Sequence, residues 1–185
     1  MTEPIRITTP LSEARARELK AGDIVFLSGV IYAARDAAHK KMVEALERGE
    51  KLPVDFTGQV VYYVGPSPAQ PGKPIGSAGP TTSGRMDSYT PKMFEQGLRG
   101  MIGKGYRAPA VVEAMKKHGV VYFAATGGAG ALIAKAIKKY EVLAYGELGP
   151  EALAAMTVED FPVIVVIDSA GNNFYEAGQK QYCQE

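Results

Sequence analysis

The sequence predicts an α/β fold, with helices layered on a mixed, partly parallel sheet. Short apolar segments rich in β-branched and aromatic residues alternate with stretches of helical periodicity along the whole chain, as in layered α/β domains. The chain has 185 residues, of which 46% are hydrophobic, so it can bury a substantial core without a disulfide or a metal. We expect one domain spanning residues 1–185, because the proline- and glycine-rich stretch 65–80 is too short to separate two domains.

The first elements are expected to be a helix and a strand. Thr9 can cap a helix and Pro10 suits its first position, so a helix is predicted to run to about Lys20. Residues 24–33 (IVFLSGVIYA) predict two short strands or one bent strand, with Gly29 as a bulge or a turn. Both options remain open from the sequence.

An amphipathic helix and a buried strand are expected next. In residues 34–53, apolar side chains recur at helical spacing, charges fill the opposite face, and a glycine and a proline end the segment. Arg35 and Asp36 therefore lie at the junction of strand and helix, where α/β folds often place site residues. Residues 59–66 (QVVYYVGP) predict the following strand.

The middle of the chain is expected to alternate between helices and strands. Thr90-Pro91 predicts the start of a short helix, and residues 100–102 predict a short strand with Lys104 at its far end. Ala108-Pro109 begins a helix that ends with cations and a glycine, as the helix dipole favours. Residues 120–126 (VVYFAAT) predict a buried strand.

The C-terminal third is expected to contain two helical segments and the most hydrophobic strand. Residues 127–139 predict a glycine turn that opens a helix, and residues 140–148 return to extended structure. A short helix is predicted near Pro150–Met156, before the strand FPVIVVID at 161–168. The last residues, 178–185, are expected to fray.

The stretch 73–87 (KPIGSAGPTTSGRMD) is the most distinctive loop of the chain. Its glycines permit close backbone approaches, and Pro80 favours an extended conformation at Gly79. Thr81 and Thr82 then stand where a helical turn could begin, with N–H groups pointing outward. Exposed amides, hydroxyls and one guanidinium group suit a carboxylate or a phosphate. A solvated connector of glycine and proline is the alternative.

Three cations stand at the ends of predicted elements, each beside small residues. Arg35, Arg85 and Lys104 occur in the sequences AARD, SGRMD and IGKGY. They could converge on one dianion, since arginine can bind a carboxylate through two parallel donors. Three independent, solvated positions are the alternative interpretation.

The remaining candidates have structural interpretations. The turn Gly127–Ala131 follows a strand but lacks the G-x-G-x-x-G spacing, so close packing is the main expectation and direct ligand contact the alternative. His39 shares a helix face with Arg35, so both could point toward one pocket, although a surface position is expected for His39. His118 suits a helix end, and Cys183 is expected to be inert.

Composition argues against several classes of function. The formal net charge is +1, from 21 basic and 20 acidic residues, which argues against binding nucleic acid through bulk positive charge. With no 18-residue apolar run and no signal-peptide pattern, we expect a cytoplasmic protein that neither spans a membrane nor is secreted. One cysteine and two histidines cannot assemble a Cys₃ or Cys₄ metal site, so such chemistry would come from a partner.

The loop and its neighbours resemble a known family. GPTTSGRMDSY (79–89), preceded by KPIGSA and by ARDAAHKK, is similar to the β subunit, or C-terminal domain, of class I (iron–sulfur) fumarate hydratases. The related L(+)-tartrate dehydratases share the pattern. KKHGVVYFAATGGAGAL, YGELGPEA and EDFPVIVVIDSAGN match the same family in order and spacing. The resemblance covers about residues 8–176.

The resemblance implies a fold and a partner. It implies a swivelling β/β/α-type domain, residues 1–185, that closes over a second, α, subunit. Three cysteines of that partner would hold a [4Fe–4S] cluster, whereas this chain would bind no metal itself. We therefore expect a hetero-oligomer that could also self-associate, with a dicarboxylate as substrate and neither nucleic acid nor membrane as partner.

The resemblance also implies roles for single residues. Thr81 is similar to a hydroxyl beside the carbon that loses its proton, and Lys104 to an active-site lysine. Substrate binding is implied for four positions: Arg35, Arg85, Thr82 and Gly79. The first expectation is a fumarate hydratase, which adds water reversibly to fumarate to give malate and is active only with its α subunit. An L(+)-tartrate dehydratase β subunit and an inactive module that binds small anions are the alternatives.

Overall fold

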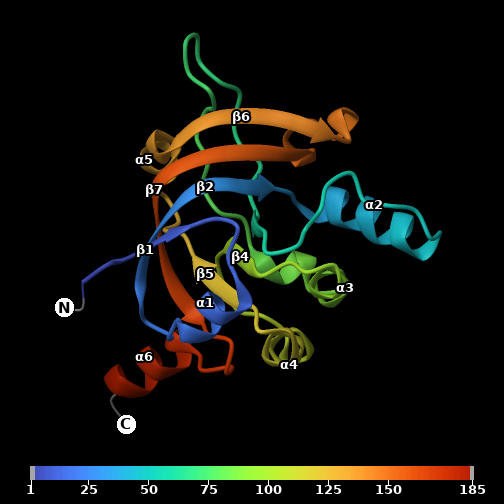
Figure 1. Cartoon of the computed structure of the whole chain (residues 1–185). Helices are drawn as coiled ribbons and strands as arrows, with labels where there is room; N and C mark the ends of the chain where they lie inside the picture. The colour runs from blue at the N-terminus through green and yellow to red at the C-terminus, as the bar shows by residue number, and fades with distance from the viewer. Residues whose placement is uncertain (1–2, 184–185) are drawn as a thin grey trace.

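The computed structural model describes residues 3–183 and contains a sheet of seven strands with helices packed on both faces (Figure 1). The strands are β1 (Ile5–Thr8), β2 (Ile24–Ala33), β3 (Val60–Tyr62), β4 (Gly100–Gly103), β5 (Val121–Ala124), β6 (Ile137–Ala144) and β7 (Leu153–Ile167). The helices are α1 (Glu13–Glu18), α2 (Asp36–Glu47), α3 (Thr90–Glu95), α4 (Pro109–His118), α5 (Gly130–Ile133) and α6 (Phe174–Tyr182). Short 3₁₀ helices are η1 (Ser83–Met86), η2 (Ala134–Ala136) and η3 (Gly146–Glu151). The predicted α/β class with a mixed, partly parallel sheet is confirmed.

The sheet closes on itself through its longest strand. Strands β1 to β5 pair in parallel in chain order, and β7 pairs antiparallel with both β5 and β2. Ile164 of β7, for example, has Ile24 of β2 as one partner and Ala124 of β5 as the other. Strands β2, β3, β4, β5 and β7 therefore form a hydrogen-bonded ring, with β6 added beside β7. Because β2 to β5 are parallel, their carboxyl ends meet at one edge.

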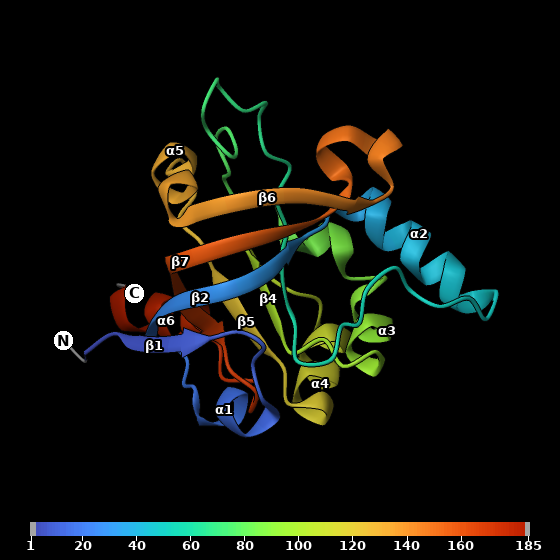
Figure 2. The same ribbon diagram turned by 45° about the horizontal axis from the view of Figure 1, so that its top comes forward.

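Two hydrophobic cores lie on the two faces of the sheet. Successive residues of β3 enter different cores, since Val60 and Tyr62 belong to the first and Val61 to the second. The first core includes residues of α1 and α5, and the second includes residues of α2, α3 and α4. Figure 2 shows these last three helices grouped on one side of the strands. Because both faces of β3, β4 and β5 are covered, the sequences of these three strands are apolar throughout rather than alternating.

The first helix begins later than predicted. Thr9 does not cap it, because its Oγ1 donates to the carbonyl of Val30 at 2.6 Å and so ties the chain to β2. Ser12 is the N-cap instead, and its Oγ accepts a backbone N–H of the first turn at 3.2 Å. β2 itself is one strand with a bulge next to Gly29, which was one of the two options from the sequence.

One helix predicted in the C-terminal third ends earlier than expected, and another is wrong. The helix predicted within 127–139 is present as α5 and η2 as far as Ala136, but β6 begins at Ile137; the extended structure predicted for 140–148 is confirmed as far as Ala144. The helix predicted near Pro150–Met156 is wrong, because η3 ends at Glu151 and β7 begins at Leu153. Local helix propensity is overridden by the sheet. Ile137 of β6 pairs with Val158 of β7, Leu153 of β7 pairs with Ala144 of β6, and the side chains of Ile137 and Leu153 are buried.

The described chain ends in a helix rather than in the frayed segment predicted for 178–185. α6 runs to Tyr182, and the side chain of Asn173 caps it by accepting the N–H of Tyr175 at 3.1 Å. Residues 184 and 185 lie outside the described part of the chain. None of the helices between residues 3 and 183 is long and apolar enough to cross a membrane.

Candidate functional site

The predicted site residues meet at the carboxyl edge of the parallel strands. Arg35 follows the end of β2, Lys104 follows β4, and the turn Gly127–Ala131 lies between β5 and α5. The distinctive loop reaches the same edge, where Thr82 forms an isolated parallel bridge with Lys104. In α/β proteins, with open sheets and with closed ones, ligands commonly bind beyond the carboxyl ends of the parallel strands.

Two of the three predicted cations converge on one carboxylate. The Nη2 of Arg85 donates to Oδ2 of Asp36 at 2.7 Å, and the Nε of Arg35 lies 3.7 Å from Oδ1 of the same side chain. The Arg85 side chain is 49% exposed and the Asp36 side chain 29%, so the cluster opens to solvent. The two arginines therefore lie together, at Asp36, and their convergence on a bound dianion stays a prediction.

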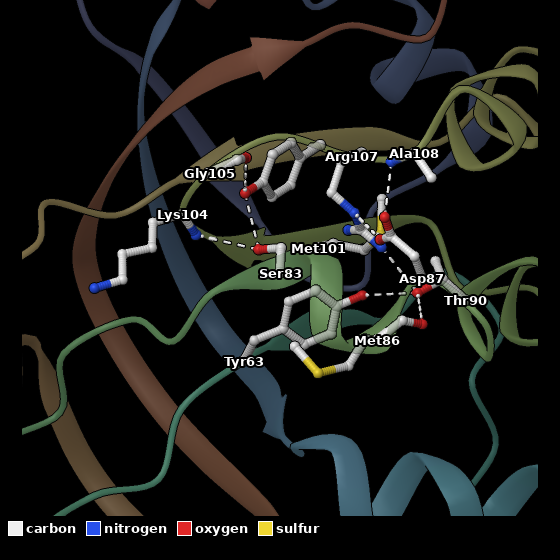
Figure 3. Close-up of polar contacts among 11 residues, drawn as sticks. Tyr63, Ser83, Met86, Asp87, Thr90, Met101, Lys104, Gly105, Arg107 and Ala108 are labelled. Carbon is white, nitrogen blue, oxygen red and sulfur yellow. Dashed lines mark hydrogen bonds and ion pairs between the residues drawn. The ribbon is translucent and has the colours of Figure 1, made fainter.

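Lys104 joins the edge through its backbone. Its carbonyl accepts the N–H of Ser83 at 3.0 Å, and its N–H donates to the Oγ of Ser83 at 3.1 Å. Its side chain is exposed, has no ion-pair partner within residues 3–183, and extends away from the side chains buried below the loop (Figure 3). Lys104 therefore lies at the predicted edge, while its ammonium group stays outside the cluster around Asp36.

The backbone also holds the two threonines of the loop. The N–H of Thr81 donates to the carbonyl of Tyr63 at 2.8 Å, and Pro80 forms a bridge with Val64. Thr82 precedes η1, so the helical turn predicted after the threonines is present. The loop is thus tied to the chain that leaves β3, which places both threonines at the sheet edge.

The glycine turn after β5 supports the loop from the other side. The N–H of Ala78 donates to the carbonyl of Gly130 at 3.1 Å. A Cβ on Gly130 would lie 2.4 Å from the Oγ of Ser77 and 2.8 Å from the backbone nitrogen of Gly79, so a side chain does not fit there. Gly130 therefore serves close packing, as expected, but its partner is the loop rather than a strand.

A buried ion pair that the sequence analysis missed lies beneath the loop (Figure 3). The Nε of Arg107 donates to Oδ1 of Asp87 at 2.6 Å, and the side chain of Arg107 is fully buried. The second oxygen of Asp87 accepts the N–H of Ala108 at 2.7 Å. The guanidinium group contacts the rings of Tyr63 and Tyr122, at 5.4 and 5.2 Å from their centroids. Asp87, which ends the GRMD motif, therefore anchors the loop to the core.

Arg107 is a structural cation rather than a ligand-binding one. Burial alone would lower the pKa of its guanidinium, but attraction to Tyr63 and Asp87 outweighs burial and the pKa is raised. Its Nη2 also donates to the Oγ1 of Thr90 at 2.9 Å, and that hydroxyl donates to the carbonyl of Met86 at 2.7 Å. Asp87, the acidic residue that ends GRMD, was the one sequence feature that could have indicated this network. The partner could not be found from sequence, because the fold alone brings the two segments together.

His39 is buried, so the predicted surface position is wrong. Its Nδ1 lies 2.8 Å from the carbonyl oxygen of Arg35, and its ring packs edge-on against Tyr63 with 5.4 Å between centroids. Burial lowers the pKa of His39 to about 4, so the ring is neutral at pH 7. Its Nε2 has no hydrogen-bond partner in the described part of the chain. His39 lies beside Arg35, as helical spacing predicted, but on the core side of α2.

The described residues do not form a metal centre. Among residues 3–183, no three His, Cys, Asp or Glu side chains are grouped so that they could hold a metal ion. A [4Fe–4S] cluster requires thiolate ligands, and the one cysteine, Cys183, is an exposed free thiol after α6. His118 lies in the last turn of α4, as predicted. A cluster at this edge would need ligands from outside this sequence.

Together, fold and site define a mixed α/β protein whose sheet edge carries an arginine cluster and a glycine–threonine loop suited to a small anion. Comparison with known families narrows this class. Residues 1–178 match the family described as Fumarase C-terminus, and the chain belongs to that family. The resemblance read from the loop motif is therefore confirmed.

Curated relatives agree with this assignment. The chain is 43% identical over 159 residues to an aerobic class I fumarate hydratase of Salmonella typhimurium, a match covering 85% of this chain and 27% of the relative. It is 38% identical over 183 residues to the aerobic class I fumarate hydratase of Escherichia coli, covering 97% and 33%. A Methanocaldococcus jannaschii protein, provisionally named L(+)-tartrate dehydratase subunit beta, is 39% identical over 177 residues, covering 92% and 91%. The chain therefore spans about a third of the enterobacterial relatives but nearly all of the archaeal one.

Proposed function

We propose that this chain is the dicarboxylate-binding half of a class I hydro-lyase that adds water reversibly to fumarate to give malate. The observation that carries the proposal is the pair of arginines, Arg35 and Arg85, gathered around the carboxylate of Asp36 at the sheet edge. Two guanidinium groups that meet at one carboxylate are arranged to bind the carboxylate of a ligand. The proposed reaction, hydration of fumarate, is inferred from the names of the relatives, which are fumarate hydratases.

The chemistry of this reaction explains why a cationic edge is useful. Removing a proton from the carbon next to a carboxylate increases the negative charge on that carboxylate. Fixed cations stabilise the added charge more in the transition state than in the ground state, and more strongly once water is excluded. We assign carboxylate binding to Arg35 and Arg85, and a supporting positive charge to Lys104, whose flexible stem reaches outward from the same edge.

We assign proton transfer to the hydroxyl of Thr81, which the loop holds at the end of β3. A threonine hydroxyl is a poor base at its ordinary pKa, so it needs a nearby cation or a carboxylate from a partner to activate it. Thr82 and Gly79 flank this position and would contact the substrate. Gly79 does so through its backbone, since it presents no side chain.

The rest of the active site is assigned to a cluster-bearing α subunit. The longer fumarate hydratases that this chain matches over about a third of their length support a second half of this kind. A [4Fe–4S] cluster there would supply a Lewis acid for the departing hydroxide. Closure of this chain over the partner, as a swivelling domain, would exclude water and strengthen the contacts of the arginines.

A second candidate substrate is L(+)-tartrate. The observation in its favour is the archaeal relative, whose length this chain nearly matches. Tartrate also carries two carboxylates, so the same arginines would bind it. Assays of the assembled enzyme with fumarate, malate and L(+)-tartrate distinguish the two reactions.

Steady-state kinetics of the assembled enzyme test the proposal. Thr81→Ala removes the hydroxyl but leaves the cations, so kcat should fall on the order of 10²-fold with little change in KM. Arg85→Lys keeps the charge but loses the two-donor fork, which should cost about 2–4 kcal/mol in kcat/KM. Arg48→Lys, at the far end of α2 and paired with Glu50, is the matched control. Wild-type rates for both site variants would refute the proposal. No turnover of any of the three compounds by the wild-type complex, with anion binding retained, would instead indicate an inactive anion-binding module.

A further inference from the structure

The side chain of Arg35 lies in a slot that leaves no room for a neighbouring side chain. A Cβ on Gly65, just after β3, would lie 2.7 Å from Nη1 of Arg35 and 3.0 Å from its Cδ. The same Cβ would be 3.4 Å from the carbonyl oxygen of Pro150 in η3. Arg35 is therefore packed directly against the backbone at Gly65, and its side chain is only 20% exposed.

Glu151 contacts both the side chain of Arg35 and the backbone at the start of α2. Its Oε1 lies 3.1 Å from Nη2 of Arg35, and its Oε2 accepts the N–H of Ala37 at 3.2 Å. Arg35 is the N-cap residue of α2 but makes no capping hydrogen bond with its own side chain. Glu151 supplies this cap from a distant segment, so one carboxylate sets both where α2 begins and where the guanidinium points.

The two arginines of the cluster are held differently. Arg85 has Asp36 as its ion-pair partner in the described residues, and its side chain is 49% exposed. Arg35 is enclosed by Gly65, Asp36 and Glu151. Its Nε is buried, lacks a hydrogen-bond partner within residues 3–183, and stays 3.7 Å from Oδ1 of Asp36. The buried Nε–H of Arg35 can therefore donate a hydrogen bond to a ligand carboxylate that binds beside Asp36 or replaces it.

We infer that Glu151 and Gly65 are positioning residues that preorganise the Arg35 guanidinium for a substrate carboxylate, an inference that rests on the proposed function. η3 thereby contributes to the site, although the sequence motif YGELGPEA carried no assigned role. A rigid donor loses little conformational entropy when the substrate binds. Arg35 thus provides the fixed half of the carboxylate site, and the more exposed Arg85 the adaptable half.

Glu151→Gln tests the role of the carboxylate in the assembled enzyme. The glutamine keeps an oxygen that can accept the N–H of Ala37 but loses the charge that holds Arg35. KM for the dicarboxylate should rise about 10-fold, with kcat within about 2-fold, because Arg35 remains present but less well positioned. Glu147→Gln is the matched control, since Glu147 lies in the same η3, is 61% exposed and pairs with Lys41 instead. An unaltered KM would show that the charge of Glu151 does not position Arg35 for the substrate and would overturn the inference, whether or not the stability of the chain changes.

A second measurement does not depend on catalysis. In ¹⁵N spectra of the free chain, the Nε–H of Arg35 can be assigned by its loss in Arg35→Lys, among eight arginines in total. It should exchange slowly with solvent in the wild type and in Glu147→Gln, and faster in Glu151→Gln and in Gly65→Ala. Unchanged exchange in both of the last two variants would overturn the inference, even if the enzyme is active. If Arg35→Ala instead leaves the kinetics of the assembled enzyme unchanged, the proposed function fails, whatever the exchange data show.

Discussion

The buried pair of Arg107 and Asp87 allows a quantitative test of how the site loop is held. Asp87→Asn preserves the size and shape of the side chain but offers one acceptor oxygen where two are needed. If that oxygen faces Arg107, the amide group opposes the N–H of Ala108, and in the reverse orientation the amide group opposes the Nε–H of Arg107. Either orientation leaves a buried donor unsatisfied and a buried charge without its counter-ion.

The expected cost follows from the burial of this pair. Removing one partner of a buried ion pair costs about 3–5 kcal/mol, which is a large part of the about 5–15 kcal/mol that stabilises an ordinary domain. Urea denaturation followed by circular dichroism should therefore show a markedly lower midpoint for Asp87→Asn, with little change in the slope of the transition. Adding Arg107→Met should restore part of the loss, because the double variant no longer contains an uncompensated buried charge.

An exposed pair of the same length provides the control. The Nε of Arg48 lies 2.6 Å from Oε1 of Glu50, the same distance as in the buried pair, but both side chains are more than half exposed. Glu50→Gln should leave the urea midpoint unchanged, since solvent screens such a pair. The reasoning is refuted if Asp87→Asn is as stable as the wild type, or if the double variant is less stable than Asp87→Asn alone.

Two further predictions concern the loop and the buried histidine. Gly130→Ala should push the loop away at Ser77 and so weaken dicarboxylate binding, because the added Cβ would lie 2.4 Å from the Oγ of Ser77. Gly127→Ala is the control and should bind as the wild type does, because its Cβ would lie 3.9 Å from the nearest atom. Calorimetric titration of the assembled enzyme with the dicarboxylate compares the two variants. His39 has a folded-state pKa of about 4 against its usual 6.5, so the unfolded chain takes up a proton first as the pH falls. The stability associated with His39 should be complete above pH 6.5 and decrease by about 3 kcal/mol toward pH 4. His39→Phe, which keeps a ring against Tyr63, should lose that part of the pH dependence of unfolding, and an unaltered profile would contradict the burial argument.

Most strands and helices of the chain could be predicted because their signals are local. β2, β3, β4 and β5 are apolar runs bounded by turn residues, and α2 and α4 carry both amphipathic spacing and end signals. The errors fall where a local signal competes with a distant partner. Residues 137–139 continue the helical pattern of the preceding segment, yet pairing of Ile137 and Lys139 with β7 makes them the start of a strand.

The residues of the candidate site also divide into those with a local sequence signal and those placed only by distant contacts. Thr81, Arg85 and Gly79 could be named as candidates because the loop has an unusual composition and a recognisable motif, and Arg35 because it stands at a strand–helix junction. Glu151 and Arg107 were not found, because neither segment has a local feature that indicates a site. Their contacts cross more than a hundred residues in one case and twenty in the other.

The sequence by itself determined the α/β class, the family, the identity of the loop and the lack of cluster ligands within this chain. These properties depend on composition, periodicity and the order of residues, which folding does not alter. Only the tertiary structure decided that β7 closes the sheet against β2, that His39 is buried, and that Asp36 joins Arg35 to Arg85. Each of these depends on which distant segments come within a few ångströms, and that choice is made by packing of the whole chain rather than by any short stretch of it.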